Sequence, residues 1–480
     1  TKKPPTRIAE LEEALRSNES YSMFRIFVGY EGRIDPDYDF NRDREARAKK
    51  VQEFISDISE SNFNEWRKKI LSVIKNYSGT EPGSYSYFDT FLRELGQKKP
   101  DIALRLIEEN EKELESFLIS LLSGIWKSKK QDKAKAIISR WAEENKHLFA
   151  CAFIFAAVEE MDEKLLRQIL DKAKEVKDVR ALNNVLRSIL RNYPNPKSLK
   201  AMFLETIKEL TKNEDAWWIN NLWFKGNSIL PELAEEEFDV ILDGLILVPQ
   251  VDFHVEEILR PVAERYPRKV IEFFHRRVEV KAKVKRDIND RYDGVPFNFH
   301  KLGEVLKQHE KIIVPIILEW YGEGDKEHNW LFKWEASHLF EEIFPGFSPV
   351  LENSLIDIIQ RGNKKSRSIV FSVLSKYKGG DSLWGVVKSL VNKYANTKEY
   401  EEVQGHLFGY LSQTGVVSGE DGFVRAYQGK KQALQELKKD EDKKFVAFIK
   451  AYEDYLDKRI AFEQKRTDEE IELMKRGLGR

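Results

Sequence analysis

Apolar residues recur at helical spacing along most of the chain. In the stretches 114–125, 165–170, 179–190 and 445–460 they lie three or four positions apart, with polar residues between them. This spacing places the apolar side chains on one face of an α-helix. Short polar turns separate one stretch from the next. The pattern therefore predicts an all-α protein.

Each apolar face is too wide for an isolated coiled coil, so neighbouring helices must cover it. Stacked helical hairpins cover such faces in an α-solenoid. The chain shows no strict repeat period, and it lacks the fixed residues of the tetratricopeptide repeat (TPR). We therefore expect an α-solenoid of stacked helical hairpins, with degenerate repeats of the HEAT or TPR kind.

Interruptions of the helical pattern divide the chain into four predicted segments. Glycine, serine, threonine and proline gather between residues 77 and 87, and periodicity stops again between residues 287 and 299. The segments are an N-terminal helical adaptor or linker, a first helical-repeat segment, a central irregular segment that is basic and aromatic, and a C-terminal helical-repeat segment with a capping helix. Their bounds are, in that order, 1–80, 81–250, 251–347 and 348–480.

The last helix is predicted to begin near Asp442. Its apolar positions continue to Ile460, and beyond Phe462 the sequence is mostly charged. We expect this tail to cap the helical array or to project from it as an interaction helix.

Most of the chain's histidines lie in the central segment, but their spacing argues against a metal site on a helix. Two ligands on one helix must be three or four residues apart to share a face. No two histidines have that spacing, and the sequence His-Glu-x-x-His is absent. His300 and His309, for example, would lie on opposite sides of a helix. We expect no metal site and no cofactor.

Other motifs of enzymes and ion-binding proteins lack the residues that carry their chemistry. Asp35, Asp37 and Asp39 resemble the start of a calcium-binding loop, yet Phe40 and Ala46 stand where glycine and glutamate are required. The chain contains neither a phosphate-binding Walker loop nor a Gly-x-Ser-x-Gly elbow. We therefore expect a protein without catalytic residues, not an enzyme.

The single cysteine, Cys151, excludes an internal disulfide, and its apolar surroundings in the sequence predict a buried, inert thiol. No apolar run approaches the ~20 residues that a membrane-spanning helix needs, and no signal peptide is apparent. These features favour the reducing cytoplasm, with no membrane partner.

Charge is abundant but balanced. Charged residues make up 34 % of the chain, yet the net charge is −1, which argues against a general binder of polyanions. The run 260–286 is the exception, because lysine and arginine greatly outnumber glutamate there. Such a run suits nucleic-acid phosphates or an acidic protein surface, or it forms a solvated helix face beside acidic neighbours such as Glu256 and Glu257.

Tryptophans follow the basic run closely, and aromatic and arginine side chains dominate the energy of many protein interfaces. We select residues from this region as candidate binding residues. The charged contacts are Arg276, Arg277, Lys281 and Lys285, and the aromatic anchors are Trp320, Trp330 and Trp334.

One pair within the basic run suggests chemistry. Arg268 and His275 flank the sequence Lys-Val-Ile-Glu-Phe-Phe. This spacing resembles the loosest form of the HEPN ribonuclease motif, in which a helical Arg–His pair cleaves RNA in a dimer. Lys269 departs from the polar residue that usually follows the arginine in that motif.

Several short stretches resemble the C-terminal helical regions of large bacterial defence proteins. They are Phe27-Val-Gly-Tyr with Ile34-Asp-Pro-Asp, Lys99-Pro-Asp-Ile-Ala-Leu-Arg-Leu-Ile-Glu-Glu-Asn, and Arg459-Ile-Ala-Phe-Glu-Gln-Lys-Arg. The proteins in question are STAND (NACHT-like) and sirtuin-linked antiphage proteins. The resemblance is spread over much of the chain. It implies a helical sensor that recognises an invader component and controls an effector domain upstream.

The chain begins at Thr1 without an initiator methionine, and we expect it to be the C-terminal part of a larger protein with its effector elsewhere. Our first hypothesis is a non-enzymatic helical-repeat module that binds a protein ligand, such as a phage component, and controls that effector. The alternatives are a nucleic-acid-binding or RNA-cleaving protein that uses the basic run, and an assembly scaffold.

Overall fold

The computed structural model describes most of the chain, in eight stretches and two short fragments. These residues are 6–17, 23, 26–27, 39–77, 86–225, 229–283, 291–322, 329–362, 364–377 and 383–478. Over this part of the chain the regular elements are α-helices and short 3-10 helices, without a strand, as the hydrophobic pattern predicts. The chain forms two compact units, unit 1 (Thr1–Leu247) and unit 2 (Val248–Arg480). The division into four segments stays a prediction.

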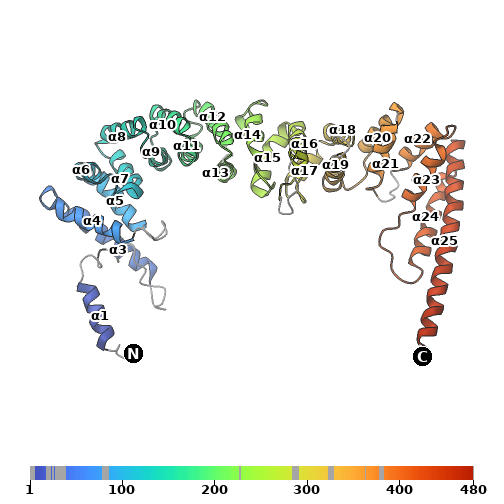
Figure 1. Cartoon of the computed structure of the whole chain (residues 1–480), viewed down its shortest axis with the longest axis horizontal. Coiled ribbons are helices and arrows are strands. Elements are labelled where there is room, and N and C mark those ends of the chain that lie inside the picture. The colour runs from blue at the N-terminus through green and yellow to red at the C-terminus, as the bar shows by residue number, and fades with distance from the viewer. Residues whose placement is uncertain are drawn as a thin grey trace. The chain divides into compact units, whose positions relative to one another are not determined.

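Unit 1 consists of helices that follow one another along the chain (Figure 1). Their bounds are α1 Thr6–Ser17, α3 Phe40–Asp57, α4 Phe63–Tyr77, α5 Ser86–Lys98, α6 Pro100–Asn110, α7 Leu118–Trp126, α8 Gln131–Glu143, α9 Leu148–Ala157, α10 Glu163–Val176, α11 Val179–Asn192, α12 Leu199–Lys212, α13 Ile219–Lys225 and α14 Phe238–Leu245. From α5 onwards most helices pack against the next helix and against the next but one. The helices α5, α7, α9, α11 and α13 are in contact in that order, and so are α8, α10, α12 and α14.

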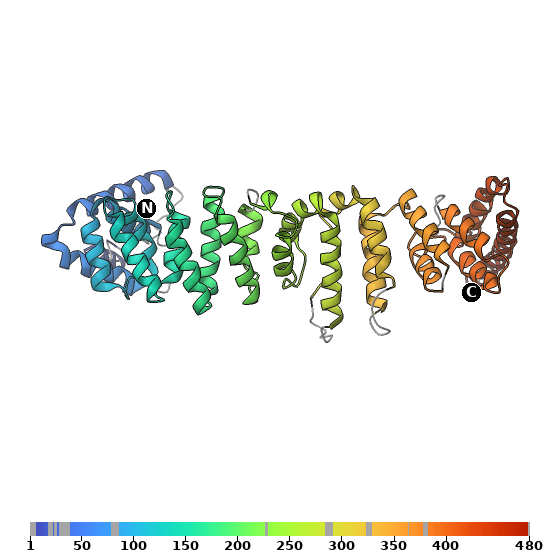
Figure 2. The ribbon, with the colours of Figure 1, turned by 90° about the horizontal axis from the view of Figure 1, so that it is seen from above.

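Unit 2 repeats this sequential packing. Its helices are α15 Phe253–Arg265, α16 Pro267–Lys283, α17 Leu302–Lys307, α18 Glu310–Trp320, α19 Asn329–Ile343, α20 Pro349–Arg361, α21 Lys364–Leu374, α22 Trp384–Tyr394, α23 Tyr400–Leu411, α24 Gly422–Leu437 and α25 Lys443–Leu478. Here α15, α17, α19 and α21 form one series of contacts, and α16, α18, α20 and α22 form the other. Within each unit, neighbouring helices lie side by side (Figure 2).

Short polar residues begin several of these helices. The side chains of Asp162, Asp178, Asp252 and Ser348 accept hydrogen bonds from backbone N–H groups in the first turns of α10, α11, α15 and α20. These N–H groups have no partner inside the helix, so each cap satisfies a donor that folding would otherwise leave without one. The local sequence therefore sets where the turns between helices fall.

The long helix α25 begins at Lys443, next to the predicted start, because the Asp442 carboxylate accepts from the backbone N–H groups of Lys444 and Phe445. It packs against α24, α22 and α23, and its packed face extends to Thr467, whose hydroxyl donates to the Glu420 carbonyl. Beyond Thr467 the helix is largely exposed.

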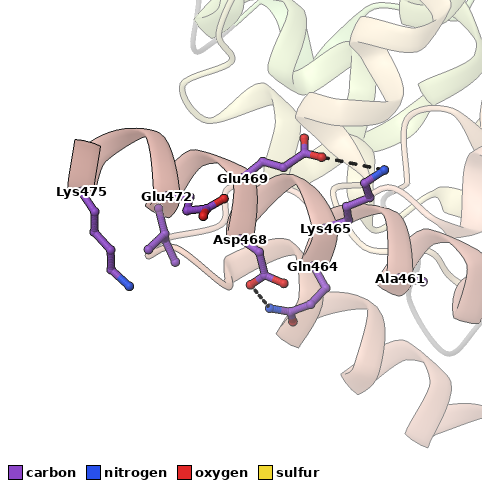
Figure 3. Close-up of a pocket in the computed structure, with 8 residues that line it drawn as sticks. Ala461, Gln464, Lys465, Asp468, Glu469, Glu472 and Lys475 are labelled. Atoms are coloured by element: carbon purple, nitrogen blue, oxygen red, sulfur yellow. Dashed lines mark hydrogen bonds and ion pairs between the residues drawn. The ribbon is translucent and has the colours of Figure 1, made fainter. Parts of the chain in front are cut away.

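A shallow hollow on this terminal part of α25 is lined by side chains of that one helix only (Figure 3). They include ion-paired and hydrogen-bonded neighbours, Lys465 with Glu469 and Gln464 with Asp468. Polar pairs of this kind, four residues apart, are typical of a solvated helix face. We assign no ligand to the hollow.

Close contact between α5 and α7 depends on two glycines. A Cβ atom at Gly124 would overlap the Arg93 carbonyl oxygen, and one at Gly96 would overlap the Leu121 carbonyl oxygen. The two backbones therefore touch where only hydrogen fits. The pairing of these helices is consequently intolerant of any larger side chain.

We predict that Gly124→Ala destabilises unit 1 by about 3 kcal/mol, because the added methyl group must push two backbones apart. The matched control is Gly405→Ala in α23, where an added Cβ meets nothing within 4 Å. Alanine should stabilise that helix by about 0.5–1 kcal/mol. Urea unfolding of both variants checks the difference, and equal effects would contradict the assigned close packing.

Candidate functional site

The candidate site lies in unit 2, where α16, α19 and the segment 291–300 come together. Helices α16 and α19 are in contact, and residues 291–300 contain no helix, which confirms the predicted interruption for the part that the structure describes (Figure 1). The segment 284–290 lies outside the described residues. Most of the residues that sequence analysis singled out belong to these elements.

The end of the irregular segment is held by Glu256 of α15. Its buried carboxylate accepts hydrogen bonds from the backbone N–H groups of His300, Lys301 and Leu302, at 3.0–3.2 Å. These groups lie at the start of α17, where the helix dipole favours a negative charge. Glu256 is therefore a helix cap, and not a counter-charge to the basic run.

Arg277 joins α16 to the beginning of unit 2 and to the irregular segment. Its guanidinium donates to the carbonyl oxygens of Val248 (2.8 Å), Pro249 (3.1 Å) and Asp293 (2.6 and 3.0 Å). It also lies over the Tyr292 ring, 4.5 Å from its centre. Burial lowers the pKa of this guanidinium, but arginine stays charged in proteins. The hydrogen bonds thus replace the water that the buried charge has lost.

Glu335 of α19 is a buried carboxylate beside this cation. Its Oε1 atom accepts from the Lys281 ammonium at 2.9 Å, whereas its buried Oε2 atom accepts no hydrogen bond from the described part of the chain. Burial raises the pKa of Glu335, and the charge of Lys281 opposes that shift. A Cβ atom at Gly294 would lie only 2.9 Å from Oε1, so this glycine lets the irregular segment close over the carboxylate.

Three stacked rings lie next to this ionic network, and we call them the aromatic column. The His338 ring lies between Phe297 and Trp334, with ring centres 5.7 Å apart on each side and interplanar angles of 26° and 13°. His338 Nε2 is 3.0 Å from the Pro296 carbonyl oxygen, and the Lys281 ammonium lies 5.6 Å from the centre of the Trp334 ring. The column therefore ties the irregular segment to α19.

The outer members of the column face solvent. Phe297 is 74 % exposed and Trp334 is 47 % exposed, while His338 between them is buried. Trp330, one helical turn before Trp334 on α19, is 50 % exposed. Large aromatic side chains with this exposure, set on a rigid base, are suited to burial against a partner.

The structure corrects two of the predicted binding residues. Trp320 is 1 % exposed and Arg277 is fully buried, so neither is available as a surface contact. Trp320 packs against the ring of His275, and Arg277 is engaged by backbone carbonyls. Their roles are structural because both side chains fill the interior of unit 2.

The other predicted binding residues differ in their exposure to solvent. Trp330 and Trp334 are exposed, Arg276 is half-buried, and Lys281 is half-buried against Glu335. Lys285 lies outside the described residues. The sequence reasoning missed Phe297, Glu335 and His338. Of these three residues, only His338 could have been identified from the sequence, because it lies four residues after Trp334 and therefore on the same helix face.

Other members of the basic run also have partners within unit 2. Arg260 is 3.1 Å from Glu257, and Arg268 is 3.8 Å from Glu272. The His275 ring packs against Trp320 and Phe332, with ring centres 5.2 and 5.4 Å apart. Together with Lys281, these two arginines are members of the run whose charge is paired with a carboxylate.

Several absences concern the described part of the chain alone. No cluster of three or more histidine, cysteine, aspartate or glutamate side chains there could hold a metal ion. No helix in these stretches is long and apolar enough to cross a membrane. Cys151 is buried, and burial raises the pKa of its thiol to about 12, as expected for an inert thiol.

Comparison of the chain with protein-family models and with curated proteins found no match.

We predict that Glu335→Gln flattens the pH dependence of stability of unit 2. The raised pKa means that the native state binds a proton more tightly than the unfolded state, so wild-type stability falls as pH rises above about 4.5. Glutamine has no proton to lose. Urea unfolding at a series of pH values from about 4.5 to 8 measures the slope. The exposed-site control Glu304→Gln should keep the wild-type profile, and a wild-type slope in Glu335→Gln would contradict the assignment.

Proposed function

We propose that the chain is a non-enzymatic α-solenoid of degenerate, HEAT-like helical hairpins. The support is the packing within each unit, where most helices contact the next helix and the next but one. Such packing buries the apolar face of each helix between its neighbours and leaves one face of every layer in solvent. A surface of this kind binds other macromolecules along the array.

We propose further that the ligand is a protein, and the aromatic column with Trp330 is the observation that carries this proposal. Phe297, Trp330 and Trp334 expose much of their ring surface, and burial of such surface drives association. The rings of the column are already held by stacking and by the Pro296 carbonyl. Because these rings are already fixed, binding would cost little additional conformational entropy, and this favours affinity.

The charged contacts in this proposal are Arg276, Lys281 and Lys285. The Lys281 ammonium pairs with the buried Glu335 and borders the exposed Trp334, so it offers its remaining N–H donors at the edge of the aromatic surface. A partner with apolar side chains flanked by acidic ones would match both features. The resemblance of the sequence to antiphage sensors supports a phage protein as the ligand, and an effector domain in the larger protein as the target of control.

Nucleic-acid binding through the basic run is the alternative, and the local pairing of Arg260, Arg268 and Lys281 with carboxylates speaks against it. Phosphate contacts need cations whose counterions are mobile. An assembly scaffold is the other alternative. The nucleic-acid alternative is tested together with the main proposal.

We predict that Phe297→Ala combined with Trp334→Ala weakens binding of a phage protein by at least about tenfold, because two anchor rings are removed. Individually purified phage proteins serve as probes in pull-down and calorimetry. Trp217→Ala, which removes an exposed ring in unit 1, is the matched control and should leave binding unchanged. Equal affinity of the double variant in a confirmed complex would refute the anchor assignment.

The nucleic-acid alternative is tested in a second assay. If the ligand is a protein, single-stranded RNA should show no binding at about 50 mM salt by fluorescence anisotropy. The nucleic-acid alternative predicts that the RNA binds under the same conditions. Binding that disappears in Arg276→Glu with Lys281→Glu would replace the protein-ligand proposal. RNA cleavage that disappears in His275→Ala would replace it with a ribonuclease.

A further inference from the structure

A second surface lies in unit 1, on the paired helices α9 and α11. Side chains of α11 donate to carbonyl oxygens of α9 that are three residues apart in the sequence. Asn184 donates to Phe149 at 3.2 Å, Ser188 to Ala152 at 2.7 Å, and Asn192 to Phe155 at 3.0 Å. Alanines and Cys151 on α9 leave room for this close approach. The two helices therefore form a rigid base.

The outer side of this base carries alternating arginine and phenylalanine side chains, which we call the arginine–phenylalanine ladder. The guanidinium of Arg180 lies 4.7 Å from the centre of the Phe149 ring, and that of Arg187 lies 5.5 Å from the centre of the Phe153 ring. The two rings are stacked at 6.5 Å with an angle of 25°. Each arginine is thus positioned by a cation–π contact.

No carboxylate of the described residues neutralises these two arginines. Helix α11 contains no acidic residue, and within the described stretches neither Arg180 nor Arg187 is in an ion pair. Arg105 is an arginine of the same unit that also lies over a ring but does have carboxylate partners. It lies 4.0 Å from the centre of the Phe63 ring, yet it also pairs with Glu60 and Glu109. The ladder therefore presents net positive charge in a chain that otherwise balances its charges.

The chemistry of the ladder fits carboxylates. A guanidinium offers its N–H groups along the edge of its plane, and this fork matches a carboxylate or a phosphate. The ring faces that Arg180 and Arg187 cover are closed to a nucleic-acid base, so the stacking that strengthens single-strand binding is not offered there. A carboxylate-bearing polypeptide is the better match.

The distance between the two arginines restricts the kind of polypeptide that fits. Arg180 and Arg187 are seven residues apart on one helix, a rise of about 10.5 Å. In a peptide of polyproline II conformation, residues three apart lie on the same face and are separated by about 9.3 Å. On this basis we propose that the ladder is a binding surface for an acidic polypeptide segment that carries a carboxylate at every third position. This surface is separate from the aromatic column, so either proposal can fail without the other.

The test uses the full chain and a fluorescein-labelled peptide with glutamate at every third residue and serine between. Fluorescence anisotropy at low salt should show binding that weakens as salt is added. A peptide of the same composition with its glutamates in one block should bind less tightly. Arg180→Glu with Arg187→Glu should weaken binding by at least about tenfold.

Two further variants separate the ladder from general charge and from misfolding. Lys475→Glu with Arg476→Glu changes the net charge equally on the exposed end of α25 and should leave binding as in wild type. Arg180→Lys with Arg187→Lys keeps the charge but removes the planar fork, and it should lower affinity while circular dichroism stays unchanged. Each of these results supports the proposal.

Three results would overturn it. The first is no binding of the spaced peptide at low salt. The second is equal binding by wild type and by the Arg180→Glu, Arg187→Glu variant. The third is tighter binding of a single-stranded RNA of equal charge that the same variant abolishes, which would assign the ladder to phosphates.

Discussion

The candidate surface of unit 2 depends on one buried cation. Arg277 donates to the carbonyl oxygens of Val248, Pro249 and Asp293, three groups that no helix satisfies. Removing the guanidinium would take this donor from the Val248 and Asp293 carbonyls and leave the Pro249 carbonyl with the Asp293 N–H alone. A hydrogen bond to a charged group contributes about 1.5–3 kcal/mol. The irregular segment is therefore fixed by a side chain of α16, and its ring at Phe297 is fixed with it.

The arginine–phenylalanine ladder and the aromatic column differ in whether their cations have a carboxylate partner. In a chain of balanced charge, many cations pair with carboxylates, and Arg105 with Glu109 is an example. Where the local sequence supplies no carboxylate, as in α11, the cation stacks on a ring instead and keeps its charge exposed to solvent. Unit 2 shows the other case, in which Lys281 pairs with the buried Glu335 and exposed rings dominate the surface.

Periodicity predicted the all-α fold, the interruption after α16 and the start of α25, because these depend on neighbouring residues in the sequence. It could not separate Trp320 from Trp334, since both lie in apolar helices and only the packing of α18 decides which is buried. It also missed Phe297 and Glu335, whose roles arise from contacts between distant segments. The arginine–phenylalanine ladder was missed for the same reason, because it joins residues of α9 and α11.

Hydrogen–deuterium exchange of residues 291–302 in wild type and in Arg277→Met tests the central claim most directly. The Asp293 N–H donates to the Pro249 carbonyl, and the N–H groups of His300 to Leu302 donate to Glu256. If Arg277 holds this segment, exchange of 291–302 should accelerate by at least about tenfold in the variant, with α11 unchanged. Wild-type protection of the segment in Arg277→Met would contradict the account.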